Sequence, residues 1–382
     1  MTRELADVLL ASLVRRDQRE KGLQYLRGLL STSGRKSIRN VAAHVGGPGA
    51  EQSLHHFISS STWDWVPVRE ALAAHLEEVS APQAWVVRSM PILKAGYQSV
   101  GVDEVFDPCM GQAFRGQHAF GVWYASESFS VPVHWRLHLP QTWVLDDNRR
   151  RRAEIPEAVD EETEEECASS AVLTTMTSWR VPVRPVVLNT YVAHIAATVG
   201  RFTRAGVPVL VRADGASLLT MRDPALPGYG GGPLGAQQIL AGVRGLGRPV
   251  EWADPAGMPC VRRTSTAVTV RVGAAKSARL SRVGAGGEDL VLLGEWEDSG
   301  HAPTAMWVTN MASVPAGVLL RMTKLAGRAR RDLAEIGEQV GIKDFEGRSF
   351  RGWHRHITLA SAAHAVVVLA GNSPARSLTD CA

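Results

Sequence analysis

The stretch AWVVRSMPILKAG, residues 84–96, decides how the rest of the chain is interpreted. Its first residues, Trp85, Val86 and Val87, form the apolar and β-branched run that is typical of a buried strand. The run stops at Arg88, whose guanidinium cannot lose its charge near neutral pH. A permanently charged residue at the end of a predicted buried strand is unexpected, and the neighbouring sequence indicates why it is there.

The composition is that of an ordinary globular protein. The chain has 382 residues, of which 45% are hydrophobic and 21% charged, and this length predicts two or three domains. The net charge is +4, and most of the positive charge is arginine, which suits phosphate. The four cysteines, Cys109, Cys167, Cys260 and Cys381, form no C-x-x-C pair, so neither a zinc site nor a disulfide framework is indicated.

The N-terminal part of the chain is predicted to be helical. Residues 1–80 carry leucines at helical spacing, and the first 16 residues form an amphipathic helix rather than a signal peptide. Within residues 37–64, two short amphipathic segments flank the turn GGPGA, which is the pattern of a helix-turn-helix and equally of a plain helical bundle. The scattered cysteines fit a reducing cytoplasm, where we expect the protein to be, and no apolar run reaches about 18 residues, so we expect no membrane span.

The remaining elements predict an α/β fold. Residues 82–145 contain several consecutive strands, which favours an antiparallel meander, and residues 168–204 are interpreted as partly helical. A buried strand then ends at Asp214, residues 223–300 are Gly- and Pro-rich with short strands, and two helices close the chain. This order indicates an RNase H-like mixed sheet flanked by helices. The predicted parts are an N-terminal helical domain (1–80), the core (81–222 and 301–382) and a small β-rich insertion (223–300).

Several motifs resemble one family. LHLPQTWVLDDNRRRRAEIPE (137–157) and DFEGRSFRGWHRHITLASAAHA (344–365) are similar to signatures of bacterial insertion-sequence transposases of the DDE type, specifically the seven-oh-one group. The resemblance spans most of the chain. It implies strand transfer or cleavage of DNA by two divalent ions held on three carboxylates, which are the hard oxygen ligands that such ions need.

The resemblance also implies where these carboxylates should be. The family's first Asp falls on Arg88, because the flanking residues 86–87, 94, 96 and 99–102 match, and Ser89 follows it where the family has an acid. Its second Asp, expected after the next buried strand, is assigned to Asp214. Its Glu falls on Arg330, with Asp332, Glu335 and Glu338 as the nearest acids. Two arginines in place of carboxylates repel divalent ions, so we expect no catalytic residues, no metal and an internal Arg88–Asp214–Arg330 ion cluster.

The first functional hypothesis is therefore a catalytically inactive, transposase-derived protein that binds double-stranded DNA and acts as a transcriptional regulator. Arginine contacts to phosphate would position such a protein on its DNA. The candidate DNA-facing residues are Arg35, Lys36, Arg39, Arg149, Arg150, Arg351, Trp353, His354 and Arg355. For each one, the alternative is an ordinary solvated or packed side chain. The oligomeric state is open, with a homodimer as one option.

Two alternatives belong to other classes. One is an active transposase with a shifted triad of Asp103, Asp214 and Glu335 or Glu338, which would bind Mg²⁺. The other is a repurposed scaffold that binds or converts a small molecule. For the second, His134 and His138 share one face of a strand, but a structural role is the simpler interpretation of such a pair.

Overall fold

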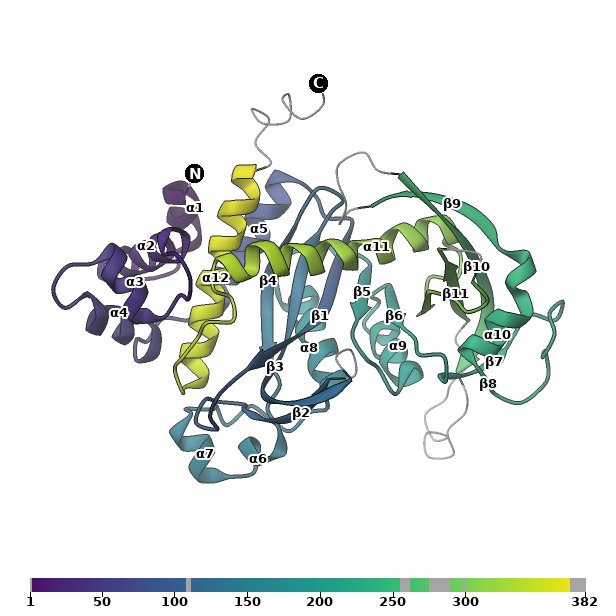
Figure 1. Cartoon of the computed structure of the whole chain (residues 1–382), viewed down its shortest axis with the longest axis horizontal. Helices are drawn as coiled ribbons and strands as arrows, with labels where there is room; N and C mark the ends of the chain where they lie inside the picture. Colours follow the sequence, from purple (N-terminus) through teal and green to yellow (C-terminus); the bar gives the residue numbers. More distant parts are fainter. Residues whose placement is uncertain (1, 108–110, 255–261, 275–288, 298–299, 372–382) are drawn as a thin grey trace, which may run out of the picture.

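The computed structural model describes residues 2–107, 111–254, 262–274, 289–297 and 300–371. These residues form one mixed sheet with helices on both faces and a helical region at one end (Figure 1). The predicted α/β class with an RNase H-like sheet is confirmed. Cys109, Cys260 and Cys381 lie outside the described residues, and Cys167 is buried with a free thiol.

The N-terminal region is helical, as predicted. Its helices are α1 (Thr2–Leu9), α2 (Arg16–Ser31), α3 (Ile38–Val45), α4 (Ala50–Ser59) and α5 (Val66–Val79). Ser37 caps α3 by accepting a hydrogen bond from the Asn40 amide. Gly49, with a φ of 79°, makes the left-handed turn that starts α4, and this conformation is easy only for glycine. The two segments of the predicted helix-turn-helix are therefore both helices.

The core sheet contains β1 (Ala84–Leu93), β2 (Asp103–Asp107), β3 (Gln112–Ala125), β4 (Ser130–Leu137), β5 (Val186–Asn189), β6 (Val209–Arg212) and β12 (Ala305–Thr309). β3 is antiparallel to β1, β2 and β4. On its other side β1 pairs in parallel with β5, and β5 pairs in parallel with β6. The predicted strands of residues 82–145 are confirmed, except that residues 97–102 precede β2 instead of belonging to it.

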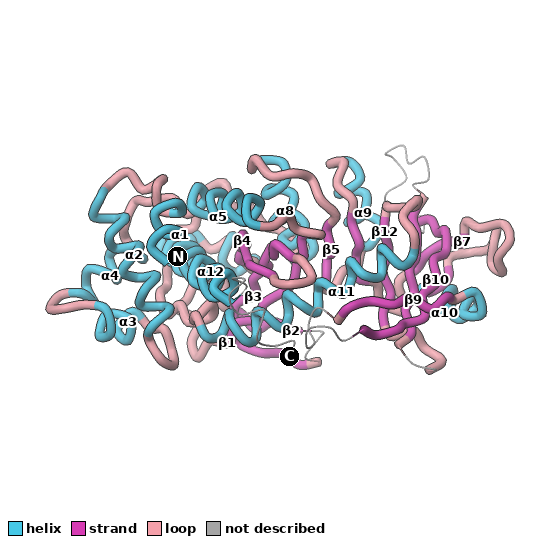
Figure 2. Tube along the Cα trace, turned by 90° about the horizontal axis from the view of Figure 1, so that it is seen from above, coloured by secondary structure: helices cyan, strands magenta, loops and turns pink. Residues whose placement is uncertain are grey.

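The helices of the core cover both faces of this sheet. They are α6 (Gln141–Val144), α7 (Asp147–Arg152), α8 (Glu164–Ser178), α9 (Ile195–Arg204), α11 (Ala316–Asp332) with the π-helical turn η2 (Leu333–Gly337), and α12 (Phe350–Gly371). Figure 2 shows α8 and α9 on one side of the strands and α11 on the other. α12 is buried along most of its length, which confirms the predicted closing apolar helix. Among the described helices, none combines the length and apolarity that crossing a membrane requires.

The region predicted as a β-rich insertion extends the core sheet. It contains β8 (Leu234–Gly235), α10 (Ala236–Val243), the 3-10 turn η1 (Arg244–Leu246), β9 (Arg248–Ala253), β10 (Arg262–Ala274) and β11 (Leu290–Trp296), and β7 (Leu218–Met221) comes just before it. β11 pairs with β12, so these strands continue the sheet. Lys324 of α11 pairs with Glu295 and lies 3.9 Å from the centre of the Trp252 ring, which fixes the long helix to this region.

A buried arginine joins the N-terminal helices to the core. Arg69 of α5 is 1% exposed, and all five of its N–H donors are used. Nε donates to the Thr358 hydroxyl, while the two Nη atoms donate to Nδ1 of His134 and of His354 and to the carbonyls of Trp135 and His354. Desolvation lowers the pKa of Arg69 to about 9, so the group stays charged at pH 7. α5, β4 and α12 are thus held together by one side chain.

Candidate active site

Arg88 and Asn189 are neighbours on one face of the sheet. β1 and β5 pair in parallel with Arg88 opposite Asn189, so their Cα atoms lie about 5 Å apart and their side chains leave the same face. Val86, two residues before Arg88, is opposite Trp123, whose ring packs 5.5 Å from that of His364 in α12. Arg88 and Asn189 therefore share the face that α11 and α12 cover. Both side chains are half-buried.

Asp214 does not occupy the position beside Arg88. It follows β6, which is the second strand from β1, so at least about 10 Å of sheet lies between them. The Asp214 side chain is exposed and accepts a hydrogen bond from the Ala216 amide at 2.8 Å, which closes a local turn. The strand next to β1 is β5, which ends at Asn189, so the structure does not form the expected Arg88–Asp214–Arg330 ion cluster.

The short strand β5 was missed because it was included in a segment interpreted as partly helical. Its signal is present in the sequence, where Pro185 precedes the apolar and β-branched run Val186–Leu188. Four residues are too few for periodicity to separate a strand from a piece of helix. The pairing with β1 then gives Asn189 its place, and this pairing cannot be derived from local sequence.

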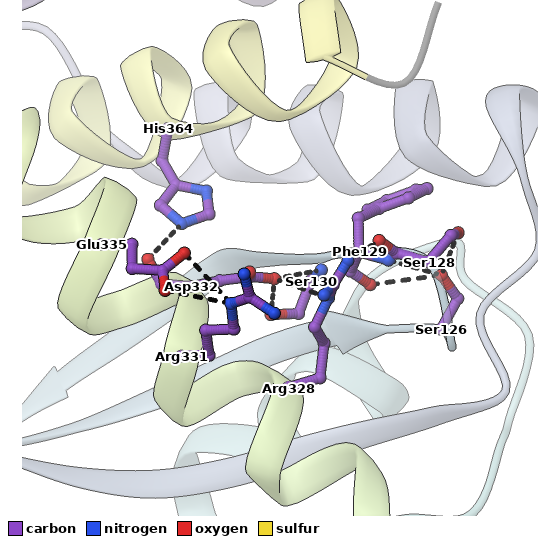
Figure 3. A network of polar contacts seen from close by, with 9 residues as sticks. All are labelled: Ser126, Ser128, Phe129, Ser130, Arg328, Arg331, Asp332, Glu335 and His364. Carbon is purple, nitrogen blue, oxygen red and sulfur yellow. Dashed lines mark hydrogen bonds and ion pairs between the residues drawn. The ribbon is translucent and has the colours of Figure 1, made fainter. Parts of the chain in front are cut away.

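Arg330 lies on the exposed side of α11, and the buried acid of this helix is Asp332. The Asp332 carboxylate accepts hydrogen bonds from the amide and the hydroxyl of Ser130, both at 2.8 Å, and pairs with Arg328 at 3.3 Å (Figure 3). Burial raises the pKa of Asp332 although Arg328 and Ser130 act in the opposite direction.

The Asp332 network is separate from the Arg88–Asn189 position. Ser130 begins β4 and is opposite Ala125, which is opposite Ala84 at the start of β1. Arg88 is four residues further along β1, about 13 Å from that end of the strand. Asp332 therefore joins α11 to the beginning of β4, and its role there is structural.

The remaining acids of the alternative triad are engaged elsewhere. Asp103, at the start of β2, accepts a hydrogen bond from the Thr142 hydroxyl at 2.8 Å. Glu335 pairs with Arg331 at 3.0 Å and Glu338 with Lys343 at 3.1 Å. Within the described ranges, no group of three or more His, Cys, Asp or Glu side chains is placed to hold a metal ion. The structure does not bring the shifted triad together, and a cation beside an amide does not fit a divalent ion.

The histidines of the small-molecule alternative have structural partners. His134 is buried against Arg69, and its pKa lies well below the usual value because of desolvation and, to a lesser extent, the charges of Arg69 and Arg136. His138 contacts the Glu162 carbonyl through Nε2 at 3.1 Å. The two rings are therefore part of separate packing contacts.

Four of the predicted DNA-facing side chains are buried, and for these the prediction was wrong. They are Lys36 (4% exposed), Trp353 (1%), His354 (5%) and Arg355 (1%). The Lys36 amine donates to the Thr32 carbonyl, and Arg355 donates to the carbonyls of Trp63 and Ile58, both at 3.1 Å. These cations fasten the helices α2, α4 and α12 by satisfying backbone groups, so they cannot contact DNA in this conformation.

The other five predicted DNA-facing residues reach the surface to different extents. Arg35, Arg39 and Arg351 are exposed, and Arg35 pairs with Glu346 at 3.1 Å. Arg149 and Arg150 are half-buried. The guanidinium of Arg150 donates to four carbonyls, those of Val144, Pro156, Glu157 and Val159. Because these carbonyls already accept hydrogen bonds from its guanidinium, Arg150 is not available to DNA. Four of the nine residues remain candidates for contact with phosphate: Arg35, Arg39, Arg149 and Arg351.

His364 of α12 is expected to make stability depend on pH. Its Nε2 contacts the Asp332 carbonyl at 3.2 Å, and burial lowers its pKa from 6.5 to about 4. The unfolded chain binds a proton near pH 6.5 and the folded chain does not, so stability is lost as pH falls from about 6.5 to 4. A His364→Leu variant should flatten this dependence by roughly 1.4 kcal/mol per pH unit. Guanidinium denaturation at pH 7, 6 and 5 measures the slope.

The exposed His44 provides the matched control for this experiment. His44→Leu makes the same replacement at the protein surface and should leave the slope unchanged. Equal slopes for the His364→Leu variant and the wild type would contradict the assignment of His364 as a buried neutral group.

Comparison with known protein families identifies the family of this chain. The sequence model of the DDE superfamily endonucleases matches residues 8–277, which is more than half of the chain. The chain belongs to the DDE superfamily endonucleases. Among solved structures, this DDE superfamily member is similar to a piggyBac transposase in a synaptic complex with hairpin DNA. The sequences are 9% identical, the TM-score is 0.37, and the match covers 99% of this chain and 80% of that chain. No curated protein gives a significant match.

Proposed function

We propose that this DDE superfamily member binds double-stranded DNA without cutting it by the two-metal route, and that its role is regulatory. The observation that supports the proposal is the register pairing of Arg88, midway along β1, with Asn189 at the end of β5, where metal-binding carboxylates would be expected. A guanidinium repels a divalent ion, and an amide contributes no charge to hold one. The family membership supports DNA as the partner.

DNA binding is tested by fluorescence anisotropy with genomic duplex fragments over a range of salt concentrations. The logarithm of the binding constant should fall linearly with the logarithm of the salt concentration, with a slope of about −0.9 for each phosphate contacted. Arg39→Gln/Arg351→Gln removes two exposed arginines. It should reduce the size of the slope by about 2 and weaken binding at least tenfold.

Arg204→Gln/Arg271→Gln is the matched control, because it removes two exposed arginines from α9 and β10. Absence of binding by the wild type to every fragment at low salt would refute the DNA-binding proposal. Cleavage of the same fragments with Mg²⁺ or Mn²⁺ tests the catalytic half. Cleavage that Asp214→Ala abolishes would favour the active-transposase alternative instead.

A further inference from the structure

A cationic pocket lies beyond the carboxyl end of β1. Its volume is about 300 Å³, at the lower end of small-molecule pockets. It is lined by Tyr97, Gln98, Trp143, Arg149, Arg152, Ala153 and Arg348. Three of these seven residues are arginines and none is an acid, which is the composition that favours an anion.

The walls of this pocket come from three segments that are tied to one another. The Trp143 indole donates to the Val102 carbonyl at 2.9 Å, which joins α6 to the segment after β1. The Val100 amide donates to the Arg348 carbonyl at 3.2 Å, and the Phe350 amide donates to that of Ala153 at 2.7 Å. These bonds hold the segments in place before any ligand arrives, so binding orders little additional chain.

The arginines of α7 are divided between structure and pocket. Arg149 and Arg152 are three apart on the helix, so they share one side, and both line the pocket. Arg150, on another side, is used by four backbone carbonyls. The Arg149 guanidinium lies 5.4 Å from the centre of the Trp143 ring and 3.8 Å from the Asp146 carboxylate, which restricts its orientation. The sequence run Arg149–Arg152 thus supplies two cations to one place.

We propose that this pocket binds a phosphate group of a DNA strand lying across the carboxyl end of β1. The planar guanidinium of arginine can donate two parallel hydrogen bonds to the oxygens of a phosphate. Three guanidiniums can bind one phosphate or two successive ones. Tyr97, which is 43% exposed, places an aromatic ring beside them, with the Arg115 guanidinium 4.2 Å from the ring centre on one face and the hydroxyl donating to Glu104, so the other face is the one for contact with a base or sugar. The identity of the anion as DNA rests on the proposed function, whereas the pocket's affinity for phosphate does not.

The test compares Arg149→Gln/Arg152→Gln with the control Arg204→Gln/Arg271→Gln in the same anisotropy assay. The pocket variant should bind duplex DNA about tenfold more weakly than the control, with the size of the salt slope reduced by about 1. In parallel, the wild type is treated with phenylglyoxal, which modifies arginines, and each arginine is read by mass spectrometry. DNA and inorganic phosphate are tested separately as protecting ligands. Both should protect Arg149 and Arg152 and leave Arg204 unprotected.

The outcomes separate the pocket from the proposed function. Equal DNA affinity of the pocket variant and the control, or no protection of Arg149 and Arg152 by either ligand, overturns the proposal. If the wild type binds no DNA but inorganic phosphate protects these arginines, the proposed function fails, and the phosphate site stands with a small phosphate compound as its ligand.

Discussion

A double variant Arg88→Asp/Asn189→Asp should bind Mn²⁺ at least 100-fold more tightly than the wild type. The two positions are opposite each other on parallel strands, so the new carboxylates would lie close enough to share one ion. At an effective dielectric constant near 20, a carboxylate 4 Å from a divalent ion contributes roughly 8 kcal/mol before desolvation is counted. The substitution of Arg88 also removes a charge that repels the ion.

Isothermal titration of each variant with Mn²⁺ measures this gain. The two single variants should each gain less than the pair, since neither supplies two ligands. Arg204→Asp changes the net charge as Arg88→Asp does, at an exposed position on α9. If the double variant bound Mn²⁺ no better than this control, Arg88 and Asn189 would not mark the position of a metal site.

The second large effect is expected at Arg69. Replacing Arg69 by Met should destabilise the folded protein by about 3–5 kcal/mol, because buried acceptors on β4 and α12 would lose their donors. Methionine retains the aliphatic volume of the arginine stem, so the loss reports mainly the polar contacts. Guanidinium denaturation at pH 7 measures it.

The exposed Arg27 of α2 is the control for this substitution. Arg27→Met should change stability by no more than about 0.5 kcal/mol. A loss of less than 1 kcal/mol for Arg69→Met would mean that the imidazoles and carbonyls around Arg69 find other partners, or that water reaches them.

Much of the fold could be predicted from local sequence. The leucine spacing of the first 80 residues, the strand that carries Arg88 and the final apolar helix each had enough residues for their pattern to be clear. The sheet extension through β9–β11 could not be predicted, because strand partners far apart in sequence are chosen by tertiary packing. A Gly- and Pro-rich composition therefore described residues 223–300 correctly as β-rich without showing that they join the core sheet.

Of the two residues of the candidate site, Arg88 could be predicted from the sequence and Asn189 could not. Arg88 could be found because an apolar run stops abruptly at a charge. The sequence around Asn189 shows no such abrupt change, and only the pairing of β5 with β1 shows that Asn189 lies beside Arg88. The burial of Arg355 and Lys36 was equally inaccessible, since a charged side chain is expected at the surface unless its partners are known. Here the partners are backbone carbonyls. Every residue has one, so the sequence does not show which carbonyls will accept hydrogen bonds from a buried cation.

The five contacts of Arg69 also bear on how related genes can recombine. A crossover between α5 and β4 would combine an arginine from one parent with a histidine, a threonine and carbonyl positions from another. Such a chimaera would keep every secondary-structure element and still lack a donor or an acceptor at its centre. A breakpoint between residues 69 and 358 should therefore be viable only where both parents share Arg69, His134, His354 and Thr358.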